Sequence, residues 1–107
     1  MKETIAQSVA EVQEHVVAHR RTLHQIPEVG LDLPQTAGYV RKILTELGCI
    51  PQNIGTCGQV VTLGQGERTL LLRADMDALQ VEEHNDLPFC AANGCMHACG
   101  HDMHTAI

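Results

Sequence analysis

The chain has 107 residues, of which 44% are hydrophobic, and its formal net charge is −6. This length suits one compact domain with a modest core, and the apolar content excludes a disordered chain. The sequence has neither the basic run of a nucleic-acid-binding protein nor an apolar stretch of the roughly 18–20 residues that span a membrane. The N-terminus is polar and lacks the apolar segment of a secretion signal, so we expect a cytoplasmic protein without nucleic-acid or membrane partners.

The first predicted element is a long amphipathic helix over residues 4–25. Its apolar side chains recur at helical spacing, and they are Ile5, Val9, Val12, Val16 and Leu23. Thr4 and Gln7 have the spacing of a capping box at the start of the helix. Pro27 disfavours helical geometry in the residue before it, which predicts the end of the helix.

A second helix is predicted from Pro34 to Leu47. Its apolar stripe consists of Val40, Ile43, Leu44 and Leu47. Asp32 occupies a position from which its side chain would cap the helix, and Gly48 is a residue that typically ends one.

Two strands are predicted next, over residues 59–63 and 69–73, joined by a turn that contains Gly64 and Gly66. The run Leu70–Leu72 places apolar side chains on both faces of the second strand. This pattern is typical of a central strand in an α/β sheet, which is covered on both sides.

A loop over residues 74–100 and a third helix that begins near His101 or Asp102 complete the prediction. Two helices, strands of a mixed sheet and the start of a third helix indicate an α/β fold. Functional sites in such sheets form beyond the carboxyl ends of the strands. Asp75 and Asp77 directly follow the second predicted strand, so they are the first candidates for a site.

Cysteine and histidine are concentrated in residues 95–104. Cys99 and His101 are two residues apart, and in an extended segment such residues point to the same side. A thiolate and an imidazole together suit zinc or another first-row metal ion, although a buried cysteine is more often a small apolar residue than a metal ligand. A ligating histidine needs an acceptor for its other nitrogen. The candidates for that acceptor are Asp75, Asp77 and Asp102.

Two long motifs now stand at a characteristic separation: Leu-Arg-Ala-Asp-Met-Asp-Ala-Leu at residues 72–79 and Met-His-Ala-Cys-Gly-His-Asp-Met-His at residues 96–104. An opening pattern, Arg-Arg-Thr-Leu-His-Gln-Ile-Pro-Glu, precedes them at residues 20–28. Together they resemble the aminoacylase/carboxypeptidase-type metallopeptidase family. The branch they resemble contains hippurate hydrolase, N-acyl-amino-acid amidohydrolase and the auxin-conjugate hydrolases.

The resemblance implies a zinc-peptidase-like catalytic domain that binds two divalent metal ions (zinc, manganese, nickel or cobalt) and cleaves the amide of an N-acyl amino acid. By match to the motif, Cys99 and His101 correspond to metal ligands and Asp77 to the acidic residue that orients a ligand. Supporting roles near the metal are assigned to Asp75, His97, Asp102 and His104.

The same resemblance implies that residues 1–107 are the N-terminal part of the catalytic domain. In the family, the general-base Glu and the other ligands follow the second motif, whereas no Glu follows Glu83 here. The dimerisation domain of this oligomeric family is absent from the sequence. We therefore expect the short chain to be inactive alone and to expose an apolar face of an incomplete sheet.

Two other classes of protein remain open. The five cysteines are an odd number, so they cannot all form internal disulfides. A structural zinc module would use Cys90, Cys95, His97, Cys99 and His101, although this spacing does not match common zinc-binding patterns. A non-catalytic interaction module would instead pair through an exposed sheet edge.

Overall fold

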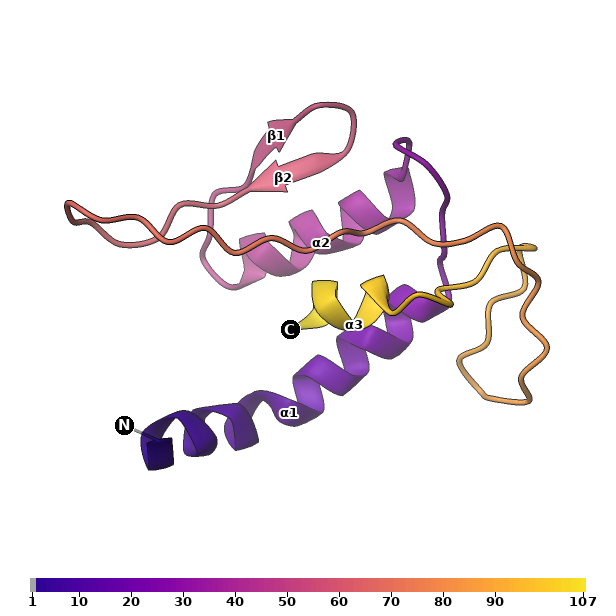
Figure 1. The fold of residues 1–107 in the computed structure, drawn as a ribbon, viewed down its shortest axis with the longest axis horizontal. Coiled ribbons are helices and arrows are strands. Elements are labelled where there is room, and N and C mark those ends of the chain that lie inside the picture. The colour runs from indigo at the N-terminus through magenta and orange to yellow at the C-terminus, as the bar shows by residue number, and fades with distance from the viewer. Residues whose placement is uncertain (1) are drawn as a thin grey trace.

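The computed structural model describes residues 2–107, which form three helices and a small hairpin linked by long extended segments (Figure 1). α1 spans Lys2–His24 and confirms the first predicted helix. Thr4 lies inside α1, so the predicted capping box of Thr4 and Gln7 is wrong: the helix begins at least two residues earlier. Only the C-terminal end of the apolar stripe is buried, because Leu23 is 2% exposed whereas Ile5 is 58% exposed.

α2 spans Pro34–Glu46 and confirms the second predicted helix. The predicted cap is wrong, since no side-chain cap involves Asp32. The Glu28 carboxylate lies at this helix start instead, and it accepts hydrogen bonds from the backbone N–H groups of Gln35 (3.2 Å) and Thr36 (2.7 Å). A carboxylate there also interacts favourably with the helix dipole, which explains why the turn before α2 is anchored by Glu28.

The hairpin consists of β1, Gln52–Ile54, and β2, Gly58–Val60, paired antiparallel with Asn53 opposite Gln59. β2 contacts α2. The first predicted strand is therefore confirmed only at its start, because pairing ends at Val60, and the sequence did not predict β1.

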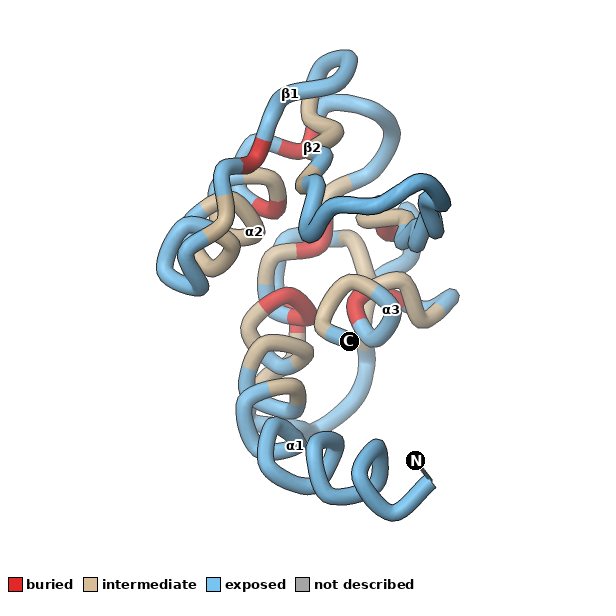
Figure 2. The backbone as a smooth tube through the Cα atoms, turned by 90° about the vertical axis from the view of Figure 1, so that its left-hand side faces the viewer, coloured by how far each residue is buried: buried red, intermediate tan, exposed pale blue. Residues whose placement is uncertain are grey.

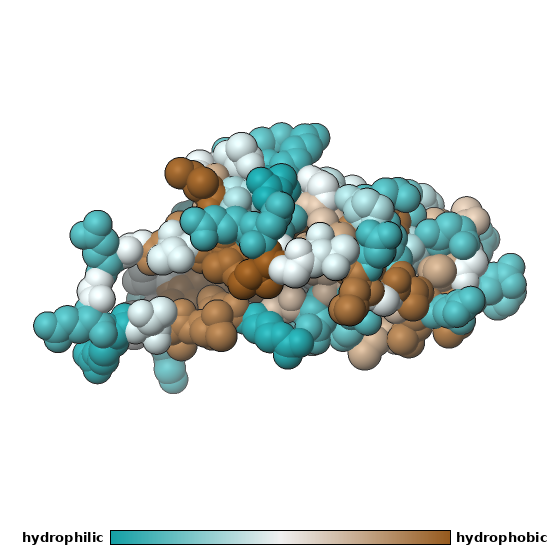
Figure 3. Space-filling model, turned by 90° about the horizontal axis from the view of Figure 1, so that it is seen from above, coloured by the Kyte–Doolittle hydropathy of each residue, from teal (hydrophilic) through white to brown (hydrophobic). Residues whose placement is uncertain are grey.

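The second predicted strand, residues 69–73, is wrong for the described chain. The segment forms no ladder with any of residues 2–107. Leu70, Leu71 and Leu72 are 83%, 81% and 85% exposed. Their pattern predicts burial in a sheet, but a strand forms only where neighbouring strands supply hydrogen-bond partners. Apolar side chains are thus exposed, and Figure 3 shows apolar side chains at the surface, but those of Leu70–Leu72 lie on an unpaired segment and not on the expected face of a sheet.

The core is small: buried residues gather where the C-terminal end of α1 meets the short helix α3, His101–Ala106, and others lie at the start of α2 (Figure 2). α3 begins at the predicted position, and residues 74–100 are mostly irregular, as predicted. The buried apolar residues are Leu23, Leu33, Ala78 and Ala91, and the buried polar residues are His24, Thr36, His97 and Asp102. Helices together with a small sheet confirm the α/β class. Among residues 2–107 we find no helix with the length and apolarity needed to cross a membrane.

Candidate metal centre

His101 is the first residue of α3, and its side chain contacts Asp77. The Nδ1 atom lies 2.8 Å from the Asp77 carbonyl oxygen and 3.0 Å from the carboxylate oxygen Oδ1. Both partners are acceptors, so Nδ1 must carry a proton and donate. The Nε2 atom has no hydrogen-bond partner among residues 2–107, and the side chain is 22% exposed. The imidazole therefore presents Nε2 as a free donor atom for a metal ion.

Cys99 and His101 are separated by a sharp turn. Gly100 has φ 98° and ψ 13°, a left-handed conformation that favours glycine, and it stands at the N-cap position of α3. The predicted extended geometry of this pair is therefore wrong, because the chain turns into the helix between the two residues. Cys99 is exposed and forms no disulfide.

Backbone contacts hold the loop before α3 in place. Leu79 and Met96 form an antiparallel bridge, with N–H to O=C distances of 2.9 and 3.0 Å. The Ala78 N–H donates to the Glu28 carbonyl at 2.7 Å, which joins the loop to the turn between α1 and α2. The Thr105 hydroxyl of α3 donates to the Asp75 carbonyl at 3.0 Å. These contacts place Asp77 beside the start of α3.

The other acidic and histidine candidates have different surroundings. The Asp75 carboxylate pairs with Arg73 at 2.6 Å, and both side chains are exposed. The His104 ring lies 6.5 Å from the ring of His101, measured between centroids. Asp77 is consequently the one carboxylate, among residues 2–107, that contacts the imidazole of His101.

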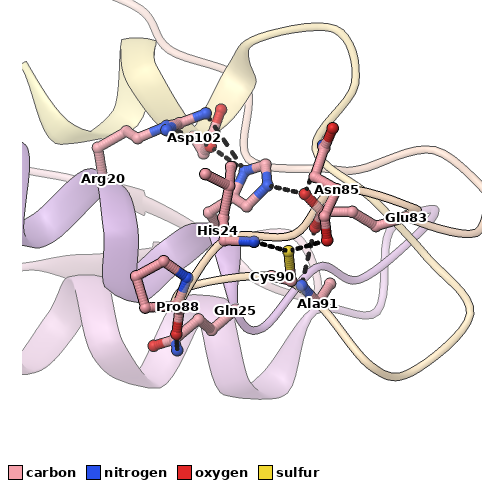
Figure 4. A network of polar contacts seen from close by, with 10 residues as sticks. Arg20, His24, Gln25, Glu83, Asn85, Pro88, Cys90, Ala91 and Asp102 are labelled. Carbon is pink, nitrogen blue, oxygen red and sulfur yellow. Dashed lines mark hydrogen bonds and ion pairs between the residues drawn. The ribbon is translucent and has the colours of Figure 1, made fainter.

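Asp102 belongs to a buried polar network (Figure 4). Its Oδ2 atom accepts hydrogen bonds from Arg20 Nε at 2.9 Å and from His24 Nδ1 at 2.7 Å. The opposite ring nitrogen of His24, Nε2, lies 2.9 Å from the Glu83 carboxylate. The network therefore connects α1, α3 and the loop that contains Glu83.

Glu83 is an anion within this network. Burial raises the pKa of its carboxyl, but hydrogen bonds from the Ala91 N–H, the Asn85 amide and His24 outweigh that effect and lower the pKa to about 2. Three donors stabilise the charged form of a carboxylate, so Glu83 remains ionised well into the acidic range.

His97 is buried, with 4% of its surface exposed. Neither of its ring nitrogens has a hydrogen-bond partner among residues 2–107. Burial lowers the pKa of His97, an effect that the negative charge of Asp102 opposes. The ring lies 6.4 Å from that of His24, between centroids, so His97 borders the network without a polar contact to it.

The donor set fits part of a metal site. Among residues 2–107, no three His, Cys, Asp or Glu side chains are grouped closely enough to hold a metal ion. This argues against the structural zinc module, which requires about four ligands. A free imidazole nitrogen, whose opposite nitrogen is fixed by a carboxylate, and an exposed thiol nearby in sequence do fit two ligands of a larger shell.

Sequence reasoning missed the linked roles of Arg20, His24 and Glu83. His24 and Arg20 belong to the opening pattern of the resemblance, but nothing local connects them with Asp102, which lies 78 residues after His24. Glu83 stands in a run of polar residues that is typical of a solvated loop. Only the tertiary fold brings these side chains together.

Comparisons with known proteins agree with the motifs. Residues 71–107 match the model of peptidase family M20/M25/M40. The chain is 42% identical to an N-acyl-L-amino acid amidohydrolase of Geobacillus stearothermophilus, over 99% of this chain and 30% of the relative. It is 40% identical to an N-acetyldiaminopimelate deacetylase of Lactococcus lactis, over 87% of this chain and 26% of the relative.

Solved structures extend the similarity to the fold. A putative aminohydrolase of methicillin-resistant Staphylococcus aureus has a TM-score of 0.90 at 36% identity, over 99% of this chain and 29% of that protein. A dinuclear metal-binding peptidase of the M20 family from Bacillus subtilis has a TM-score of 0.80 at 32% identity, over 91% and 29%. The chain spans less than a third of the length of each of these proteins. Motifs, fold and relatives agree, and the chain belongs to peptidase family M20/M25/M40.

Proposed function

We propose that this chain supplies the first part of a two-metal amidohydrolase centre, in which Cys99 and His101 bind a divalent metal ion and Asp77 orients His101. The observation that carries the proposal is the contact between His101 Nδ1 and Asp77, which leaves Nε2 free. Two relatives named as an amidohydrolase and a deacetylase, and a neighbour described as a dinuclear metal-binding peptidase, support the same chemistry.

Each residue has a defined task in this proposal. Asp77 keeps the proton on Nδ1 of His101, so the lone pair of Nε2 points outward and its basicity rises. Cys99 gives up its thiol proton and binds as a thiolate. The divalent ions, when bound, supply the activation of water and the polarisation of the scissile carbonyl. Zinc, manganese, nickel and cobalt are the candidate ions, since the pair of donors discriminates weakly among them.

The substrate that we propose for the whole protein is an N-acyl amino acid such as hippurate. Residues 1–107 form the N-terminal part of its catalytic domain, and the protein is cytoplasmic and oligomeric in this proposal. The general-base carboxylate must come from a Glu beyond the second motif, and no Glu follows Glu83 in this sequence. The 107-residue chain should therefore bind metal weakly and hydrolyse nothing by itself.

A cobalt titration of the reduced chain tests the assignment of the ligands. We expect a thiolate-to-cobalt charge-transfer band that is lost in Cys99→Ala and in His101→Ala. Cys49→Ala is the matched control, because Cys49 is a free, partly exposed cysteine outside the motif. A band that survives Cys99→Ala unchanged, or that Cys49→Ala removes, would contradict the proposal.

Hydrolysis of hippurate by the purified chain tests whether catalysis requires residues beyond these 107. With zinc, manganese or cobalt present we expect no rate above the metal-only background, because the general base is absent from the sequence. Chelator-sensitive hydrolysis that Cys99→Ala abolishes would show that the 107 residues suffice for catalysis.

A further inference from the structure

The imidazole of His24 lies between two carboxylates that belong to distant parts of the chain (Figure 4). Nδ1 is 2.7 Å from Asp102 Oδ2, and Nε2 is 2.9 Å from Glu83 Oε2. All three side chains are at most 2% exposed. Each ring nitrogen thus faces a carboxylate oxygen at hydrogen-bond distance, and an ionised carboxylate accepts hydrogen bonds but cannot donate them.

One of the two carboxylates fixes the start of α3. Asp102 directly follows His101, and its second oxygen, Oδ1, accepts a hydrogen bond from the Met103 N–H at 3.0 Å. Arg20 adds a further contact from α1 at 2.9 Å. α3 has only six residues, too few to be stable by local interactions. Asp102 therefore ties its first turn to α1.

The other carboxylate fixes the loop that leads to Cys99. Glu83 accepts hydrogen bonds from the Ala91 N–H at 2.8 Å and the Asn85 amide at 2.9 Å. It thereby closes the segment 83–91, which lies inside the loop between the bridged residues Leu79 and Met96 and precedes Cys99 in the chain. The same imidazole thus secures both chain segments that flank the candidate ligands.

We propose that His24 is a positioning residue of the metal centre: its ring fastens α3 and the 83–91 segment to α1, and so holds His101 and Cys99 in their binding arrangement. His24 itself contacts neither metal nor substrate. The inference rests on the proposed function, since it takes Cys99 and His101 as the ligands.

Three substitutions of His24 distinguish its contact with Asp102 from its contact with Glu83. His24→Asn places an amide nitrogen near the position of Nδ1 and can keep the hydrogen bond to Asp102. His24→Gln places it near the position of Nε2 and can keep the hydrogen bond to Glu83. His24→Ala removes both. Leu23→Ala is the control for general loss of stability, because Leu23 is an equally buried neighbour with an apolar side chain.

The first measurement needs no metal. Nitrogen-15 NMR of the imidazole rings reports which nitrogen of His101 carries the proton. We expect the Nδ1–H form in the wild-type chain and in His24→Asn. In His24→Gln and His24→Ala we expect a mixture of the two tautomers, because the start of α3 is no longer held beside Asp77.

The second measurement is the dissociation constant of Co²⁺. We expect His24→Gln and His24→Ala to weaken binding by about tenfold, at the low end of the usual effect of residues that orient ligands. His24→Asn should remain close to the wild-type value. Leu23→Ala should change neither readout, even where its melting temperature falls as far as that of the His24 variants.

Unchanged tautomer and affinity in His24→Gln and His24→Ala would overturn the proposal, and so would equal changes in Leu23→Ala. If His24→Ala does not fold, the contrast between the Asn and Gln variants decides. Failure of the proposed function looks different: the wild-type chain would show no Co²⁺ band, while the tautomer of His101 would still report whether His24 positions it.

Discussion

His101 and Asp77 face each other across the start of α3, with Nδ1 at 3.0 Å from the carboxylate and 2.8 Å from the carbonyl of the same aspartate. The backbone carbonyl would remain an acceptor if the carboxylate were removed. The carboxylate alone raises the basicity of the ring, so the two contacts have separable effects on metal binding.

We expect Asp77→Ala to weaken Co²⁺ binding by about 10–100-fold, the usual cost of losing a carboxylate behind a ligating histidine. Asp77→Asn should have a smaller effect, since its amide oxygen can still accept the proton of Nδ1. Equilibrium titration measures both. Asp75→Ala is the control, because the Asp75 carboxylate pairs with Arg73 in solvent, and an equal loss there would contradict the assignment of Asp77.

The ionisation of Glu83 predicts how stability changes in acid. The pKa of Glu83 is about 2 in the folded chain, against an ordinary value of 4.5. Because the folded value is the lower one, the unfolded chain binds more protons in this window. The stabilisation is present above pH 4.5 and is lost as the pH falls toward 2. Urea unfolding should show a smaller dependence on pH in this window for Glu83→Gln than for the wild-type chain.

An equal slope for Glu83→Gln and the wild-type chain would show that the acid sensitivity arises elsewhere. Glu82→Gln is a suitable control, because the neighbouring Glu82 side chain is 76% exposed and lies 4.0 Å from the exposed His84.

The anchoring of α2 predicts a contrast between two acidic residues. Glu28→Ala removes both hydrogen bonds to the helix start and should lower the free energy of unfolding by about 1 kcal/mol. Asp32→Ala should stay within about 0.5 kcal/mol of the wild-type value, as expected at a surface position. Chemical denaturation followed by circular dichroism measures both. A larger loss of unfolding free energy in Asp32→Ala than in Glu28→Ala would show instead that Asp32 caps the helix.

The exposed leucines predict self-association. Three consecutive apolar side chains on an unpaired extended segment favour pairing with another chain. Sedimentation velocity should show concentration-dependent oligomers, and the combined changes Leu70→Ser, Leu71→Ser and Leu72→Ser should reduce them. Leu31→Ser is the control, because Leu31 is as exposed but isolated. A monodisperse wild-type monomer would refute the prediction.

The helices could be predicted because their signals are local. The apolar spacing over residues 4–25 and the placement of Pro34 and Gly48 are readable from the sequence, and α1 and α2 follow them closely. The run Leu70–Leu72 also gives a clear signal, but the signal concerns burial. No segment among residues 2–107 covers it, so the predicted strand is absent.

The candidate site divides in the same way. The motifs predicted that Cys99 and His101 are metal ligands and that Asp77 orients a ligand. The structure contains the contact between Asp77 and His101. The cap by Glu28 and the bridge by His24 depend on side chains that meet only after folding. Asp102 shows the limit most clearly: its partners precede it by 82 and 78 residues, a separation at which no sequence spacing carries information.

The distribution of contacts along α1 has a consequence for how the molecule opens. Its first three turns carry exposed valines and isoleucine, whereas its last turn holds the buried Leu23 and His24. Helical turns without tertiary packing are only marginally stable in water. The free energy of local opening should therefore rise steeply along this one helix toward His24. Its N-terminal amide hydrogens should exchange with solvent through fraying, whereas those at its C-terminal end should exchange only when the whole core unfolds.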